Sequence, residues 1–322
     1  MRLFIILAAF AGLSWAQSVQ PLRLEKTIEL PDVQGRIDHM SIDVKGERLF
    51  VSALGNNTLE IVDLKAGKKT DTIGQLKEPQ GVLYVPEANR LYVANGNDGS
   101  VRVFDASSYA PVKTLDYGDD ADNLRYDPAH KRIYVGYGSG ALGEINGDGN
   151  KVADIKLDAH PESFQLEKNS LRIYVNLPKS RNVAVVDRET HTILATWKTD
   201  LAFANYPMAQ SEHRLFVVTR MPARLLVFDT NTGSIVQKLP AVGDCDDFFL
   251  DQTRKRIYAS GGDGAISVFQ EQDADHYAEL ARITTDKGAR TSLFSPDLDR
   301  LFLAVRRQGS QAAGIKVFVP AQ

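Results

Sequence analysis

The sequence has little cysteine, little tryptophan and no marked excess of either charge. Its single cysteine, Cys245, cannot form a disulfide within one chain. No metal-type or redox-type spacing surrounds Cys245, so we interpret it as a small side chain near a loop. Two tryptophans argue against repeat classes that are built on a recurring Trp. The 38 Lys and Arg residues stand against 41 Asp and Glu residues, which indicates neither nucleic acid nor an anionic membrane as a partner.

Long hydrophobic runs are also lacking, apart from one at the start of the chain. Arg2 is followed by an apolar run that is too short to span a bilayer comfortably, and small residues flank a cleavage point after Ala16. This pattern predicts a signal peptide over residues 1–16. No cysteine follows it, so a lipoprotein anchor is not expected. We therefore expect residues 17–322 to be periplasmic or secreted, with no membrane span.

One pattern recurs seven times along the chain. An arginine opens a short run of the type Leu or Ile, then Tyr or Phe, then a small or branched apolar residue. The seven runs are Arg48–Val51, Arg90–Val93, Arg132–Val135, Arg172–Val175, Arg214–Val217, Arg256–Ala259 and Arg300–Leu303. Their arginines are 40 to 44 residues apart. A period of this length is typical of propeller blades.

Each repeat has room for four short antiparallel strands. In four repeats the run after the arginine strand ends in an aspartate that suits a turn, at Asp63, Asp105, Asp187 and Asp229. The pattern predicts an all-β fold, a single seven-bladed β-propeller with four-stranded antiparallel blades over residues 17–322. The last repeat lacks an outermost strand, and the run Leu22–Leu30 resembles one. We therefore expect the N-terminal strand to complete the last blade, which leaves no free sheet edge.

The repeat resembles a known motif. The Tyr-Val steps that begin at Tyr92, Tyr134 and Tyr174, followed by a valine-rich strand and a turn, resemble the YVTN repeat. The chain as a whole resembles the YncE-like family of exported seven-bladed propellers. The resemblance implies the fold and export. It implies no activity, because the motif residues form strands and turns.

Residues shared by all blades are expected to be structural, so function should lie where equivalent positions differ. The innermost strands of a propeller line a central channel, and counting nine and ten residues back from each repeat arginine locates where they start. These positions predict a ring of polar side chains around one mouth of the channel. Our candidate binding residues in this ring are Asp38, His39, Gln80, Asp122, Asn123, Glu162, Asn205, Asp246, Asp247 and Arg290. Loops that border the same mouth add Arg220 and Arg306.

The carboxylates of this ring would repel one another unless a cation or the arginines compensate. Asp122, Glu162 and Asp246 are the candidate metal ligands, because their oxygens suit Ca²⁺ or Mg²⁺. Two histidines near the same mouth, His39 and His160, would extend the site to a transition metal. The alternative is a solvated rim that holds no ion. No other cofactor is indicated.

Two classes of function stay open. The first is an exported binding or scaffold protein that recognises a small molecule, a glycan or a protein partner at the channel mouth and its loops. The second is an enzyme, a metal- or acid/base-dependent lyase or lactonase, with its site in the acidic mouth. No catalytic residue is nominated, because no known nucleophile or metal-hydrolase motif is present. We expect a monomer and no nucleic-acid partner.

Overall fold

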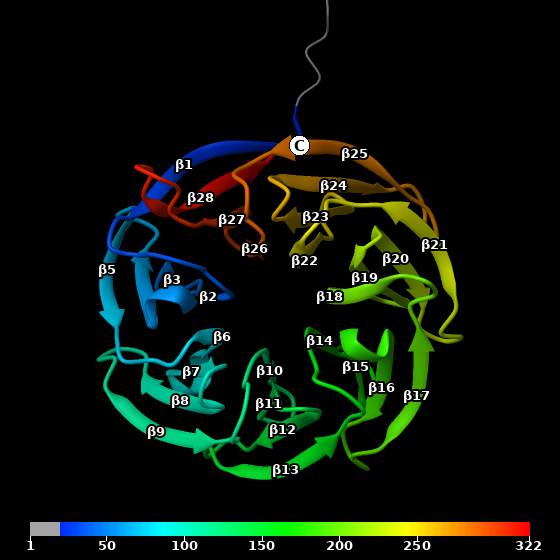
Figure 1. The fold of residues 1–322 in the computed structure, drawn as a ribbon, viewed down its shortest axis with the longest axis horizontal. Helices are drawn as coiled ribbons and strands as arrows, with labels where there is room; N and C mark the ends of the chain where they lie inside the picture. The colour runs from blue at the N-terminus through cyan, green and yellow to red at the C-terminus, as the bar shows by residue number, and fades with distance from the viewer. Residues whose placement is uncertain (1–19) are drawn as a thin grey trace, which may run out of the picture.

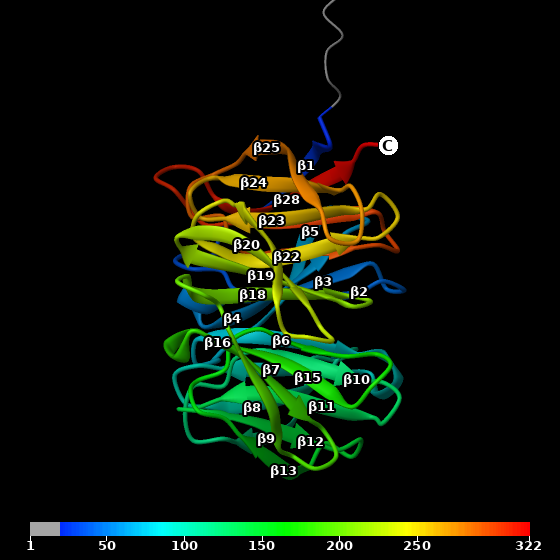
Figure 2. The ribbon, with the colours of Figure 1, turned by 90° about the vertical axis from the view of Figure 1, so that its right-hand side faces the viewer.

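Seven four-stranded sheets form a closed ring around a central channel (Figure 1). This computed structural model describes residues 20–322, so the predicted signal peptide over 1–16 lies outside the described residues. Seen edge-on, the ring is a thick disc (Figure 2). The predicted all-β, seven-bladed propeller is confirmed. Among the helices of the described residues, none is long and apolar enough to cross a membrane.

The strands of each blade are antiparallel and follow one another from the channel outward. The innermost strands are β2 (Met40–Asp43), β6 (Pro79–Val85), β10 (Leu124–Asp127), β14 (Phe164–Leu166), β18 (Phe203–Ser211), β22 (Cys245–Asp251) and β26 (Ser292–Ser295). The second strands are β3 (Arg48–Ala53), β7 (Arg90–Asn95), β11 (Arg132–Tyr137), β15 (Arg172–Leu177), β19 (Arg214–Met221), β23 (Arg256–Gly261) and β27 (Arg300–Val305). In all seven blades the second strand begins at the repeat arginine, as the repeat predicts.

The third strands are β4 (Thr58–Asp63), β8 (Ser100–Asp105), β12 (Ala141–Ile145), β16 (Asn182–Asp187), β20 (Ala223–Asp229), β24 (Ala265–Glu271) and β28 (Ala313–Pro320). The outermost strands are β5 (Lys68–Ile73), β9 (Pro111–Asp116), β13 (Lys151–Lys156), β17 (Ile193–Lys198), β21 (Ile235–Pro240), β25 (Tyr277–Thr284) and β1 (Leu22–Leu30). Three short 3₁₀ turns interrupt the loops: η1 (Leu54–Asn56), η2 (Pro86–Ala88) and η3 (Pro178–Ser180).

The repeated polar residues hold turns together. The guanidinium of Arg48 pairs with Asp43 at 2.8 Å across the turn between β2 and β3. Asp63, which ends β4, accepts a hydrogen bond from the backbone N–H of Ala66 at 2.7 Å. Both residue types therefore act locally on the blade, as expected of positions that recur around the ring.

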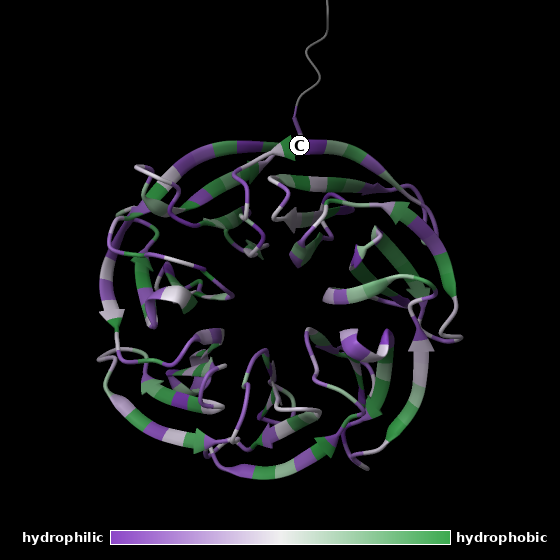
Figure 3. Ribbon diagram, viewed as in Figure 1, coloured by the Kyte–Doolittle hydropathy of each residue, from purple (hydrophilic) through white to green (hydrophobic). Residues whose placement is uncertain are grey.

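The hydrophobic core lies between neighbouring blades. Each blade buries the aromatic residue of its repeat, and Phe50, Tyr174, Phe216 and Tyr258 are almost fully buried. The second and third strands are largely hydrophobic, whereas the innermost and outermost strands mix hydrophobic and hydrophilic residues (Figure 3). This mixture suits strands with one face in solvent.

The ring closes between the two ends of the chain. Strand β1 pairs with β28 from Leu22 opposite Pro320 to Leu30 opposite Ala313, so the first strand is the outermost strand of the last blade. Ile28 and Leu30 are buried in this contact. The predicted closure by the N-terminal strand is confirmed, and it pairs the β28 edge that would otherwise be open.

Candidate functional site at the channel mouth

A cavity of about 310 Å³ lies at the mouth of the channel where the innermost strands begin. Its walls come from all seven blades and the loops that enter them. The lining residues are Arg36, Asp38, His39, Gln80, Asp120, Asp122, His160, Glu162, Lys179, Tyr206, Arg220, Asp246 and Arg290. Thus the mouth is mostly charged, with both signs present.

The blade repeat positions the carboxylates. In three blades a backbone N–H at the start of the innermost strand donates to a carbonyl of the second strand. The donors and acceptors are Asp38 N to Ser52 O at 2.7 Å, Asp122 N to Gly136 O at 2.9 Å and Glu162 N to Asn176 O at 3.0 Å. The same bond therefore places an acidic side chain at the same point of blades 1, 3 and 4.

One glycine brings two of these blades close together. A Cβ on Gly81, in the innermost strand of blade 2, would lie 2.2 Å from the carbonyl oxygen of Asp122. Only glycine permits this approach, because the clash would be with backbone rather than with a flexible side chain. Gly81 therefore helps to position the peptide that carries Asp122.

An arc of arginines and aspartates covers one side of the mouth. The Arg290 guanidinium pairs with Asp246 at 2.8 Å and with Asp244 at 2.9 Å, and Arg220 pairs with both carboxylates as well. The Arg220 guanidinium also lies 3.9 Å from the centre of the Tyr206 ring. Burial raises the pKa of Tyr206, so its hydroxyl stays a neutral hydrogen-bond donor. This side of the mouth is nearly neutral, because its charges compensate one another.

His39 lies at the lower edge of the mouth. Its Nδ1 is 3.3 Å from Asp247, and its Nε2 is 3.7 Å from Asp38, which in turn pairs with Arg36. Burial alone would lower the pKa of His39, but the charge and hydrogen bond of Asp247 outweigh it and hold the pKa well above its ordinary value. We therefore infer an imidazolium at neutral pH.

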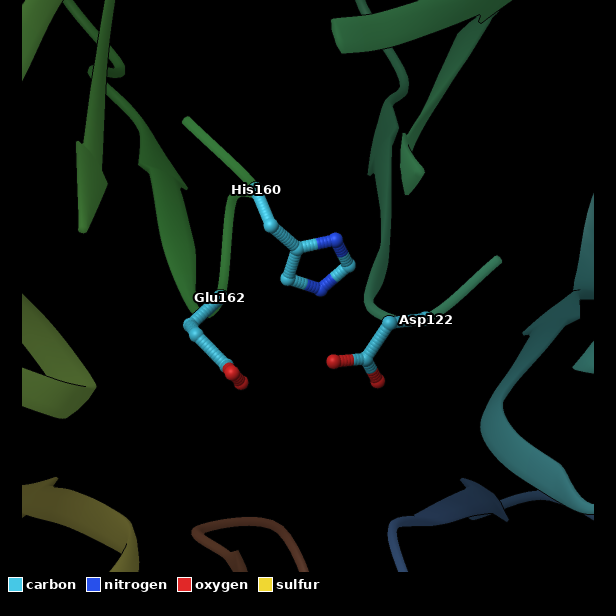
Figure 4. A group of neighbouring side chains, drawn as sticks. All are labelled: Asp122, His160 and Glu162. Carbon is cyan, nitrogen blue, oxygen red and sulfur yellow. The ribbon is translucent and has the colours of Figure 1, made fainter. Parts of the chain in front are cut away.

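Three side chains on the opposite side point toward one another. Asp122, His160 and Glu162 each offer one ligand atom, and these atoms lie within 4.8 Å of one another (Figure 4). The His160 Nδ1 is 2.6 Å from the carbonyl oxygen of Gly138, which can only accept, so Nδ1 carries the proton. In Figure 4 the other ring nitrogen faces the two carboxylates. An imidazole oriented by a backbone carbonyl in this way is typical of metal ligands.

The two carboxylates of this group have no cation paired with them, although the charge of His39 acts on both from a longer distance. Asp122 is 5% exposed, and within residues 20–322 neither its carboxylate nor that of Glu162 has a hydrogen-bond or ion-pair partner. Burial raises the pKa of Asp122 to about 6, and burial with the nearby Asp122 charge raises that of Glu162 well above its ordinary value. A buried carboxylate without a partner favours either a proton or a bound cation.

The structure brings most of the predicted binding residues to this mouth. Eight of them line it: Asp38, His39, Gln80, Asp122, Glu162, Arg220, Asp246 and Arg290. Four lie elsewhere. Asn123 and Asp247 line the channel below the mouth. Asn205 is fully buried, where its amide donates to Asn176 and to the carbonyl of Asn182. Arg306 lies against Gly288 rather than in the mouth cavity.

Two further differences have a physical reason. The mouth residue of blade 5 is Tyr206, which counting from the repeat arginine did not indicate, because the counted positions are Ala204, which has no polar side chain, and the buried Asn205. Asp246, which we grouped with Asp122 and Glu162 as a metal ligand, is instead bound by two arginines. His160 takes its place in the cluster. The spacing Asp120-x-Asp122 and His160-x-Glu162 was the available signal for that histidine.

Comparison with curated proteins finds relatives of limited similarity. Two uncharacterized proteins named YncE, from Salmonella typhi and Salmonella typhimurium, are 30% and 29% identical to the chain over 99 residues. The protein NirF of Stutzerimonas stutzeri is 23% identical over 237 residues, which is 66% of this chain. The matches span 27% of the length of the YncE proteins and 60% of NirF. No family model matches the sequence.

Solved structures agree on the fold. A chain of the mitotic checkpoint complex has a TM-score of 0.79 at 14% identity and covers all of this chain, with 99% of its own length matched. The WD40 repeats of RRP9 have a TM-score of 0.78 at 10% identity, over 94% of this chain and 98% of theirs. A chain of Kuenenia stuttgartiensis hydrazine synthase scores 0.72 at 17% identity, over 90% of this chain and 97% of its own. At these identities the likeness concerns the fold alone. With YncE and NirF among its relatives and seven repeats closed into a ring, the chain is a seven-bladed β-propeller related to YncE and NirF.

Proposed function

We propose that this protein is a binding protein whose channel mouth holds a divalent cation on Asp122, His160 and Glu162, and beside it a small polar ligand. The observation that carries the proposal is the carboxylate of Asp122, which is buried, without a partner and aimed at His160 and Glu162. A divalent cation would compensate both unpaired carboxylates at once.

The donor set narrows the choice of ion. Two carboxylates and one imidazole nitrogen suit a transition metal such as Zn²⁺ or Mn²⁺ better than Ca²⁺ or Mg²⁺, which prefer oxygen alone. Three protein ligands leave at least one coordination position open. That position would face the mouth cavity, where Tyr206 and Lys179 supply donors for an oxygen-rich ligand.

The proposal includes export of the protein from the cytoplasm. The predicted signal peptide over residues 1–16 supports a periplasmic or secreted binding protein, acting as a monomer on a small ligand or a glycan. Its tests are the N-terminal residue and the cell fraction of the expressed full-length chain. Export would be contradicted if the expressed chain still carried residues 1–16 and was found in the cytoplasm.

A metal-dependent lyase or lactonase is the second candidate function, and His39 is the observation that favours it. Its imidazolium borders the same cavity, and the raised pKa suits a general acid. The structure nominates no matching base, because Asp122 and Glu162 serve as metal ligands in this proposal. For this reason we place binding first.

The test is metal titration of the chelator-treated, tag-free protein by calorimetry, with Zn²⁺, Mn²⁺, Ca²⁺ and Mg²⁺ compared. We expect one Zn²⁺ or Mn²⁺ per chain and weaker binding of Ca²⁺ and Mg²⁺. Asp122→Asn, His160→Ala and Glu162→Gln should each weaken the binding at least about tenfold, since even residues behind the ligands contribute that much. The control is Asp71→Asn, the same change at an exposed carboxylate of β5. Equal binding by wild type and Asp122→Asn would overturn the proposal.

A further inference from the structure

A second cavity of about 460 Å³ lies inside the ring, below the mouth. It extends from His39 and Asp247 to Gln210 and Gln252 at the far ends of the innermost strands. Its walls are mixed. Leu83, Phe249 and other apolar side chains alternate with a few polar groups, and Arg125 is the one arginine or lysine among the lining residues.

Arg125 has no ion-pair partner in the described chain, although the charges of Asp247 and Asp122 act on it from a longer distance. Its Nη1 donates to the carbonyl of Leu124 at 2.8 Å, and its Nη2 donates to the Ser163 hydroxyl at 3.3 Å. The guanidinium carbon is 5.5 Å from the centre of the Phe164 ring. Within the described chain no carboxylate pairs with it, and burial lowers its pKa. Three of its five N–H groups therefore stay free for a ligand.

The position of Arg125 in the blade makes the charge unusual. Arg125 lies opposite Tyr134, the aromatic residue of its repeat. The residues in the same position of the other blades are all uncharged and line the same cavity: Ser41, Leu83, Gln165, Ala209, Phe249 and Leu293. Leucine therefore fills this place in blades 2 and 7, and the fold itself does not require an arginine there.

A charge that is partly withdrawn from water and has no ion-pair partner, as at Arg125, lowers stability unless something compensates it. The repeat arginines illustrate the contrast, since Arg48, Arg172 and Arg214 each pair with a carboxylate at a turn. Arg125 has an open cavity in front of it instead. We propose that this cavity is a binding site for a small organic monocarboxylate with an apolar body, whose carboxylate pairs with Arg125.

The cavity offers contacts for both the carboxylate and the apolar body of such a ligand. The planar guanidinium matches a carboxylate in a two-pronged arrangement. Leu83, Phe249 and Leu293 would contact the apolar body. The volume is within the range of known small-molecule sites. This site shares no proposed metal ligand with the mouth, because neither Asp122 nor Glu162 lines the lower cavity, although His39 borders both cavities.

Benzoate titration of the full chain, followed by calorimetry and melting curves, tests the proposal. Benzyl alcohol is the neutral probe of similar shape, and inorganic phosphate is the anion without an apolar body. We expect benzoate to bind and to raise the melting temperature, and the other two to bind at least tenfold more weakly. Phosphate that binds as tightly as benzoate, or benzoate that does not bind at millimolar concentration, would overturn the proposal.

The variant Arg125→Leu adds a second measurement. It should lose benzoate binding at least tenfold while its ligand-free melting temperature equals or exceeds that of the wild type, because leucine already fits this position in two blades. Arg102→Leu, the same change outside the cavity, should bind benzoate as the wild type does. Undiminished benzoate binding by Arg125→Leu would contradict the pairing of Arg125 with the carboxylate. A ligand-free melting temperature several degrees lower would instead make Arg125 a structural residue. Asp122→Asn should keep benzoate binding, which separates this result from the fate of the metal site.

Discussion

Asp38, Asp122 and Glu162 occupy the same position of three blades, yet their surroundings give them different chemistry. Asp38 pairs with Arg36 and lies near the imidazolium of His39, so its charge is compensated. Asp122 and Glu162 face each other and His160 with no cation paired to them, and the charge of His39 acts on them only from a longer distance. An acidic residue at the channel mouth is therefore a candidate ligand only where the neighbouring blade supplies no cation.

The raised pKa of Asp122 predicts an unusual pH dependence of stability in the metal-free protein. Burial holds its pKa at about 6, above the ordinary 3.8. Between these values the folded state binds the proton more tightly than the unfolded state, so the free energy of unfolding falls as pH rises from 4 to 6. Two pH units correspond to about 2–3 kcal/mol. Asp122→Asn should reduce this slope, to which Glu162 also contributes because its pKa is raised as well, as measured by urea unfolding with chelator at pH 4, 5, 6 and 7.

Bound metal should reverse the direction in which the free energy of unfolding changes with pH. Protons and the cation compete for the same carboxylates, so saturating Zn²⁺ should stabilise the wild type more at pH 7 than at pH 5. Asp71→Asn serves again as the control. Without metal, its free energy of unfolding should change with pH as that of the wild type does. If Asp122→Asn and wild type show the same slope without metal, Asp122 does not titrate as proposed.

At the scale of the strand, the site depends on how closely neighbouring innermost strands approach. Strands β6 and β10 meet at Gly81 and the carbonyl of Asp122, so the backbone of one blade sets the position of a side chain in the next. This contact crosses blades, and the repeat motif of a single blade does not contain it.

Gly81→Ala should therefore disturb both stability and the metal site. The added Cβ would lie 2.2 Å from the Asp122 carbonyl oxygen, and the backbone must move to relieve the clash. We expect a loss of about 1–3 kcal/mol in the free energy of unfolding and weaker Zn²⁺ binding. Gly74→Ala is the matched control, since its Cβ would meet nothing within 4 Å. Equal melting temperatures for the two variants would contradict the assigned contact.

At the scale of the whole molecule, stability depends on closure of the ring. Strand β1 is the only strand of its blade that comes from the other end of the chain, and it covers the edge of β28. Loss of this pairing would open both the ring and a sheet edge at once.

Ile28→Ala tests the closure. Ile28 is 1% exposed on β1, and its truncation should lower the free energy of unfolding by about 2–5 kcal/mol. Leu24→Ala on the same strand, where the side chain is 45% exposed, should have a much smaller effect. Denaturant unfolding measures both. Similar losses in the two variants would mean that β1 does not pack as described.

Much of the architecture could be predicted from the sequence, because it rests on local patterns that repeat. The arginine repeat located the start of all seven second strands, and the surplus run at Leu22–Leu30 predicted the closing strand. The same counting found Asp38, Asp122 and Glu162 at the mouth, since these positions follow the regular register of their blades. In blade 5 counting indicated the buried Asn205 instead of Tyr206, because the packing that buries the Asn205 amide is a tertiary contact.

By itself, the sequence determined the number of blades, the closing strand and the polar character of the channel mouth, because each follows from the period and the composition of one repeat. Only the tertiary structure decided which charges are compensated. The pairing of Asp246 with Arg220 and Arg290, the isolation of Asp122 beside His160 and the unpaired Arg125 all depend on contacts between blades. Such contacts join residues that lie tens of positions apart in the sequence. Their distances depend on how whole sheets pack, so a local sequence pattern does not predict them.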